Sequence, residues 1–99
     1  MNLEEYLLVS LMEECAEITQ GAAKALRFGL DDCHPDRPNE TNEQDILVEM
    51  YQLQMVFEKL IKENIITDLP ENMKDIIKEK KIRKIEEYIE YAKEKGKIK

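Results

Sequence analysis

Residues 3–28 read LEEYLLVSLMEECAEITQGAAKALRF, and this stretch decides the fold. It contains no proline, a single glycine, and apolar residues that recur every three or four positions, which is the spacing of one face of an α-helix. Asn2 precedes it with Glu5 three residues later, a pattern typical of a capping box, and Gly29 follows as a helix-ending residue. The sequence therefore predicts a long amphipathic helix over 3–28. Its buried face comprises Leu3, Leu7, Leu11, Cys15, Ile18, Ala22, Ala25 and Leu26.

A loop and a second amphipathic helix follow. Residues 29–40 contain two prolines and no helical period, so we expect a loop. Thr41 then opens a second capping box with Gln44. Apolar residues at helical spacing predict a helix over about 42–63, with a buried face of Ile46, Met50, Leu53, Phe57, Leu60 and Ile61.

The last part of the chain predicts a third helix and no strand. Pro70 suits a first helical turn, and helical spacing continues through 71–94 until Gly96. We therefore expect one all-α domain over residues 1–99, a bundle of three main helices. A 26-residue helix is about 40 Å long, whereas a compact chain of this length has a radius of gyration of only ~13 Å. Because such helices cannot cover their own apolar faces, we expect oligomerisation to complete the core, with a dimer as the minimum.

Composition excludes several classes of protein. The chain is 42% hydrophobic with a net charge of −7, and residues 1–73 carry 16 acidic but only 5 basic side chains. This acidic body argues against general binding to a nucleic acid polymer. No apolar run is long enough to span a membrane, and we see no signal peptide. Two cysteines and one histidine argue against a disulfide framework or a structural zinc site, so we expect a cytoplasmic protein.

Helical spacing places acidic side chains beside both predicted buried faces. Glu14 and Glu17 fall along the edge of the first apolar stripe, and such i, i+3 side chains are neighbours. Glu49 and Gln52 repeat this arrangement on the second helix, with Asp45 one turn earlier on the same edge. If the two helices pack antiparallel, the two polar edges can face each other.

A cluster of this kind is a candidate metal site. Carboxylates so close together repel one another unless a cation lies between them. Oxygen donors without histidine or cysteine are what Mg²⁺ or Mn²⁺ prefers, and the natural chemistry is hydrolysis of a phosphoanhydride. The alternative is a helical oligomerisation protein whose acids form a solvated face.

Several motifs resemble a known family. They are the EExxE motif at Glu13, Glu14 and Glu17, the run KALRFGLDD at 24–32, the TN pair at 41–42, DLP at 68–70, and the spaced Lys81, Lys84, Tyr88, Tyr91 and Ala92. In this ordered set the chain resembles the MazG-like all-α nucleoside triphosphate pyrophosphohydrolases, most closely the small branch found mostly in bacteriophage genomes.

This resemblance implies an all-α bundle that assembles as a dimer or tetramer and hydrolyses a nucleoside or deoxynucleoside triphosphate to the monophosphate and pyrophosphate. It implies Mg²⁺, with Mn²⁺ as the alternative ion, held by Glu14, Glu17, Glu49 and residue 52. For a phage-encoded chain it implies the host cytoplasm. The chain departs from the family pattern at Gln52, where the family has aspartate. A member that binds or sequesters a nucleotide, or a nucleotide-derived signal, without cleaving it is therefore the alternative function.

Further residues are candidates for roles around the metal. We expect Glu13 to position or deprotonate the attacking water. Lys24 lies on the same helix edge as the acids and can neutralise a phosphate, and Arg27 lies further round the helix. Lys81 and Lys84 lie in the net-positive segment, where the resemblance implies basic residues that hold the substrate's phosphates. Each of these basic residues has the alternative of being a solvated surface charge.

Overall fold

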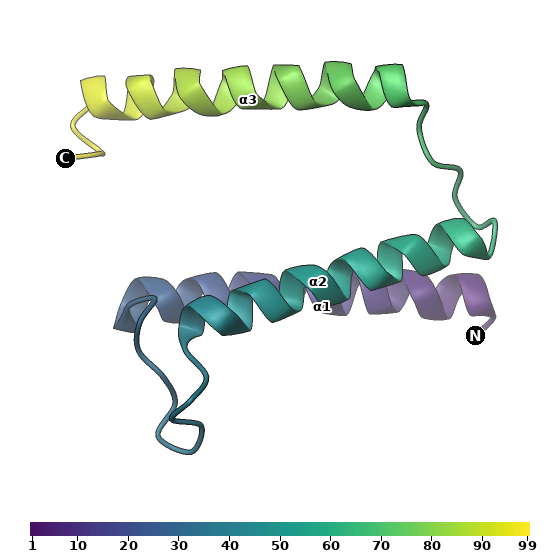
Figure 1. Cartoon of the computed structure of the whole chain (residues 1–99), viewed down its shortest axis with the longest axis horizontal. Helices are drawn as coiled ribbons and strands as arrows, with labels where there is room; N and C mark the ends of the chain where they lie inside the picture. The colour runs from purple at the N-terminus through teal and green to yellow at the C-terminus, as the bar shows by residue number, and fades with distance from the viewer. The chain divides into compact units, whose positions relative to one another are not determined.

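The computed structural model describes residues 1–99 and contains three α-helices and no strand. They are α1 (Leu3–Phe28), α2 (Asn42–Lys62) and α3 (Glu71–Glu94) (Figure 1). The predicted all-α class is confirmed. Two of the predicted helices have the observed bounds, and α2 ends one residue earlier than predicted.

Both ends of α1 are closed as the sequence predicts. The Glu5 backbone N–H donates to Asn2 Oδ1 at 2.8 Å, which satisfies a donor that the first turn leaves free. At the other end Gly29 has φ 98°, a conformation that glycine adopts without strain, and its N–H donates to the Ala25 carbonyl at 2.8 Å.

The loop between α1 and α2 is tied to both helices. The Thr41 hydroxyl accepts from the Gln44 N–H at 3.1 Å, and the Gln44 side chain accepts from the Thr41 N–H at 3.0 Å, so the predicted capping box is present. The next residue, Asn42, donates its side-chain amide to the Gly29 carbonyl at 2.8 Å. The Asn42 backbone N–H donates to the Asp32 carbonyl at 2.8 Å. These bonds join the end of α1 to the start of α2.

Residues 1–67 form one compact unit, in which α1 and α2 lie side by side and antiparallel (Figure 1). Gly21 allows a close approach of the helices, because a Cβ added there would lie 3.2 Å from Ile46 Cγ1. Few side chains are buried, and among apolar residues only Leu7 and Leu60 are. The α1–α2 pair therefore has a narrow core and leaves much of the predicted apolar stripes exposed, as expected for a core that oligomerisation completes.

Residues 68–99 form the second compact unit, which contains α3. Pro70 is the residue before the helix rather than part of its first turn. Lys74 pairs with Asp68 at 2.9 Å across the start of the helix, and Gly96 follows the helix with φ 72°. No residue of α3 is buried. None of the three helices combines the length and apolar character that crossing a membrane requires.

Candidate metal centre

Three carboxylates from two helices meet on the first unit. Glu14 and Glu17 lie one turn apart on α1, and Glu49 lies on α2; one oxygen from each lies within 4.8 Å of the others. We call these residues the carboxylate cluster. Oxygens on opposite sides of an octahedral Mg²⁺ lie about 4.2 Å apart, given bonds of ~2.1 Å. The cluster therefore offers only hard oxygen donors, at a spacing that small side-chain movements can bring to Mg²⁺ distances.

The crowding of these groups changes the protonation of Glu49. Its pKa is raised from 4.5 to about 7, chiefly by a hydrogen bond with Glu17, and then by partial burial and by the Glu17 charge. Glu14 contributes in the same way and less strongly. Near neutral pH, the metal-free cluster therefore carries a proton on Glu49 for part of the time.

Gln52 reaches the same cluster from α2. In the amide orientation that satisfies its neighbours, its nitrogen donates to Glu49 Oε2 at 3.0 Å and to Glu14 Oε2 at 3.3 Å. The residue expected as the fourth ligand is thus placed beside the carboxylates, where it acts as a donor in the metal-free protein. Its amide oxygen becomes available to a cation only after the amide rotates.

An open pocket extends from the cluster toward the loop. It encloses about 240 Å³, and we call it the acidic pocket. Asp45 pairs here with Arg37 from the loop, whose guanidinium lies 3.6 Å from the Asp45 carboxylate. The residues that line the pocket are Glu17, Gln20, Gly21, Lys24, Arg37, Asn42, Asp45 and Glu49.

The other predicted site residues have different positions. Lys24 lines the acidic pocket, whereas Glu13 is exposed and lies outside the carboxylate cluster. The Arg27 guanidinium lies 5.4 Å from the centre of the Phe28 ring, at the end of α1. Lys81 and Lys84 are exposed on α3, in the second unit, and their role stays a prediction.

Sequence reasoning missed Arg37 and Asn42 as pocket residues. Arg37 lies in the predicted loop between two prolines, where it is the one basic residue among acids, and that isolation was an available signal. Asn42 was noted only as part of the TN pair at 41–42, with no role in a site. Nothing local in the sequence indicates its bond to Gly29, thirteen positions earlier.

Comparison with known proteins adds no relative: no family model matches the chain, and no curated protein and no solved structure is detectably similar to it.

Proposed function

We propose that this protein is a Mg²⁺-dependent nucleoside triphosphate pyrophosphohydrolase that releases a nucleoside monophosphate and pyrophosphate. The observation that carries the proposal is the convergence of Glu14, Glu17 and Glu49 from α1 and α2. The basic side chains of Lys24 and Arg37 line the pocket that opens beside them. Carboxylates for a metal next to cations for phosphates are the two parts that hydrolysis of a phosphoanhydride requires.

The residues divide the chemistry between them. Bound Mg²⁺ would neutralise phosphate charge and lower the pKa of a bound water. Lys24 and Arg37 would hold the phosphates in place by charge-assisted hydrogen bonds. Water oxygen attacks the α-phosphorus, the bond from that phosphorus to the bridging oxygen breaks, and pyrophosphate leaves. A carboxylate beside the water takes its proton; Glu13, the group expected from the sequence for this step, lies outside the carboxylate cluster.

The resemblance to the MazG-like pyrophosphohydrolases supports the same function. It concerns the EExxE motif and the KALRFGLDD run on α1 and its following loop. The ligand positions implied by that resemblance include the three acids of the carboxylate cluster.

The test is a panel of nucleoside and deoxynucleoside triphosphates, each incubated with Mg²⁺ or Mn²⁺ and assayed for pyrophosphate. Glu17→Gln should weaken Mg²⁺ binding about tenfold or more and lower pyrophosphate release. It should leave the metal-free melting temperature unchanged or raise it, because one of three repelling charges is gone. Glu58→Gln, on α2 outside the cluster, is the matched control and should resemble the wild type. If Glu17→Gln lowers the metal-free melting temperature and leaves Mg²⁺ affinity unchanged, the carboxylate cluster is not the metal site.

Nucleotide binding without cleavage is the second candidate function, and Gln52 favours it. Its amide neutralises the cluster partly by hydrogen bonds and brings no charge for a metal. On this alternative, a nucleotide raises the melting temperature with Mg²⁺ present, and no pyrophosphate appears. Product analysis on the same samples therefore separates the two functions.

A further inference from the structure

Arg37 is the cation of the acidic pocket that already has carboxylate partners. Its Nη1 donates to Glu40 Oε2 at 3.0 Å, and its Nη2 lies 3.6 Å from Asp45 Oδ2. The first contact is a hydrogen bond, whereas the second is an ion pair too long to be one. Lys24, the other cation that lines the pocket, makes no ion pair. An anion that enters the pocket therefore finds Lys24 free and Arg37 occupied.

The two partners of Arg37 have different places around it. Asp45 lines the acidic pocket, whereas Glu40 lines only a neighbouring open pocket of about 550 Å³. Of these two carboxylates, only Asp45 stands where a phosphate in the acidic pocket would meet the guanidinium.

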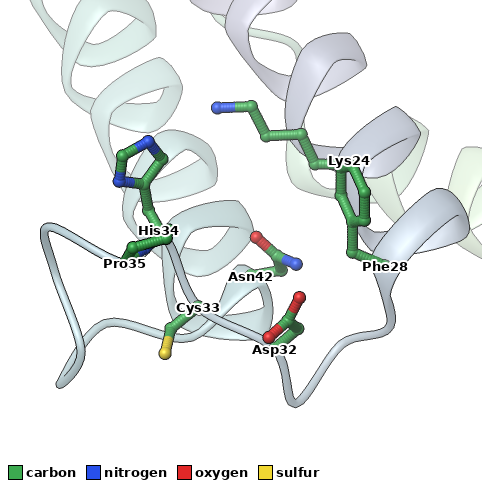
Figure 2. Close-up of a pocket in the computed structure, with 7 residues that line it drawn as sticks. All are labelled: Lys24, Phe28, Asp32, Cys33, His34, Pro35 and Asn42. Atoms are coloured by element: carbon green, nitrogen blue, oxygen red, sulfur yellow. The ribbon is translucent and has the colours of Figure 1, made fainter.

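Lys24 approaches the acidic pocket from the other helix. Its side chain extends from α1 toward α2 (Figure 2). It also lines a second pocket of about 220 Å³, which we call the loop pocket and which Phe28, residues 32–35 and Asn42 complete. Arg37 does not line the loop pocket. The acidic pocket is therefore the place where both cations can reach one anion.

The groups around Arg37 oppose an anion in the metal-free protein. Three carboxylates line the acidic pocket, those of Glu17, Asp45 and Glu49, against two cations. A guanidinium binds a phosphate best through two parallel N–H bonds. Both terminal nitrogens of Arg37 are already directed at carboxylates, so a phosphate must take the place of one of them. The longer contact, with Asp45, is the weaker of the two.

This exchange requires only side-chain rotation. The Arg37 backbone N–H donates to the His34 carbonyl at 2.8 Å, and the Arg37 carbonyl accepts from the Glu40 N–H at 3.1 Å. These bonds hold the backbone of the loop in place. The side chains of Arg37 and Asp45 are 47% and 30% exposed, so neither is locked by packing.

We propose that Asp45 is an internal competitor for phosphate at Arg37, which it occupies in the free protein and from which a phosphate of the substrate displaces it. This inference rests on the proposed function, because it takes the acidic pocket as the site of the nucleotide's phosphates. Glu40 keeps its hydrogen bond and positions Arg37 throughout. The affinity of the pocket for phosphate is lowered by the fraction of time that Asp45 holds the guanidinium. The same contact favours release of pyrophosphate, since Asp45 returns to Arg37 as the product leaves.

The test is an NMR titration of the whole chain with pyrophosphate, in EDTA and without divalent cations. Asp45→Asn should raise the affinity about fivefold, the upper end of what a partly exposed ion pair contributes. Glu40→Gln is the matched control, because it removes the same charge from the same guanidinium. Its amide oxygen can still accept from Arg37, so the affinity should change less than about twofold.

Two further variants separate the contact from the general effect of charge. Arg37→Gln and Lys24→Gln each remove one positive charge from the acidic pocket, and each should weaken pyrophosphate binding. Adding Asp45→Asn to Lys24→Gln should raise the affinity about fivefold. Adding it to Arg37→Gln should raise the affinity less than about twofold, because the group for which Asp45 competes is gone.

The proposal is overturned if Asp45→Asn binds no more tightly than the wild type, or if Glu40→Gln gains as much. Equal gains on the Lys24→Gln and Arg37→Gln backgrounds would also overturn it, as would the absence of pyrophosphate binding in every variant. The proposed function fails separately. Pyrophosphate binding that follows the expected pattern, without pyrophosphate release from any nucleotide, refutes hydrolysis alone. Release from nucleotides, with Asp45→Asn binding pyrophosphate as the wild type does, refutes the competition alone.

Discussion

At the scale of single residues, Glu49 and Gln52 together reduce the repulsion among the carboxylates of the metal-free cluster. Three carboxylates within 4.8 Å would repel strongly if all were ionised. The proton held by Glu49 removes one charge for part of the time, and the Gln52 amide donates to two of the acids. A bound cation would neutralise the same charges in place of the proton and the amide.

The raised pKa of Glu49 predicts that rising pH lowers the stability of the metal-free protein and increases the stabilisation that Mg²⁺ provides. Between about pH 4.5 and 7, folded Glu49 keeps a proton that the unfolded chain has lost. The free energy of unfolding of the metal-free protein should therefore fall as the pH rises through that window, and level off above it. Mg²⁺ must displace this proton, so its stabilising effect should grow as the pH rises through 7.

Thermal melting from pH 5 to 8, with EDTA or with Mg²⁺, measures how stability changes with pH in the metal-free and the metal-bound protein. Glu49→Gln should remove this contribution to the metal-free slope, whereas Glu58→Gln should keep it. Equal slopes in the two variants would contradict the protonation of Glu49 in the cluster.

Gln52→Asp puts a fourth carboxylate in place of the one amide that reaches the carboxylate cluster. The change removes the amide donor and adds a fourth negative charge, so the metal-free protein should melt lower, by ~4–8 °C for each kcal/mol lost. With Mg²⁺ the same charge should raise metal affinity about tenfold and increase pyrophosphate release. Asn72→Asp adds equal charge on α3, at an exposed residue outside the cluster and outside the first unit, and is the control. If both variants melt alike with and without Mg²⁺, and turnover is unchanged, residue 52 does not serve the metal.

At the scale of helices, local chemistry explains why the bounds were predictable. Asn2, Gly29 and Thr41 act through backbone bonds within four residues, and the sequence displays such signals directly. The positions of Glu14 and Glu17 beside the apolar stripe were readable for the same reason, since helical spacing is local.

Contacts between residues far apart in the sequence could not be predicted in this way. The bond from Asn42 to Gly29, the pairing of Arg37 with Asp45 and the loop pocket depend on how the loop folds back between the helix ends. Loops of this kind have no period that predicts their path. Gly21 is the single glycine of the predicted first helix, but only the structure identifies Ile46 as the neighbour that an added Cβ would crowd.

Thr41 tests how far the start of α2 depends on its cap. Thr41→Ala removes the hydroxyl that accepts from the Gln44 N–H, at an expected cost of ~1 kcal/mol and a melting temperature lower by about 4–8 °C. Thr41→Ser keeps the acceptor and should melt near the wild type. A drop of equal size in both variants would mean that the Thr41 methyl group, rather than the cap, supports the helix.

At the scale of the whole molecule, the α1–α2 pair has an apolar groove that its own side chains do not fill. Met50 is 53% exposed and Phe57 43%, and both belong to the predicted buried stripe of α2. No charged residue lines the groove. Its members are Leu11, Cys15, Met50, Leu53, Gln54 and Phe57. Contiguous apolar surface of this kind is typical of an interface between chains.

We therefore predict that the chain is an oligomer at micromolar concentration and that Phe57→Glu separates it into monomers. A glutamate in the groove loses apolar burial and must either lose its hydration or keep the second chain away. Tyr51→Glu introduces the same charge on α2, at a side chain 65% exposed and outside the groove, so it should stay oligomeric.

Analytical ultracentrifugation gives the mass of each species. Melting at several protein concentrations shows whether association stabilises the fold. Because association stabilises the folded chain, the wild type and Tyr51→Glu should melt higher as concentration rises, and Phe57→Glu should not. A wild type that sediments as a single monomeric species would refute the oligomer. An oligomer that survives Phe57→Glu unchanged would mean that the chains meet on a different surface, and the groove would then need another explanation.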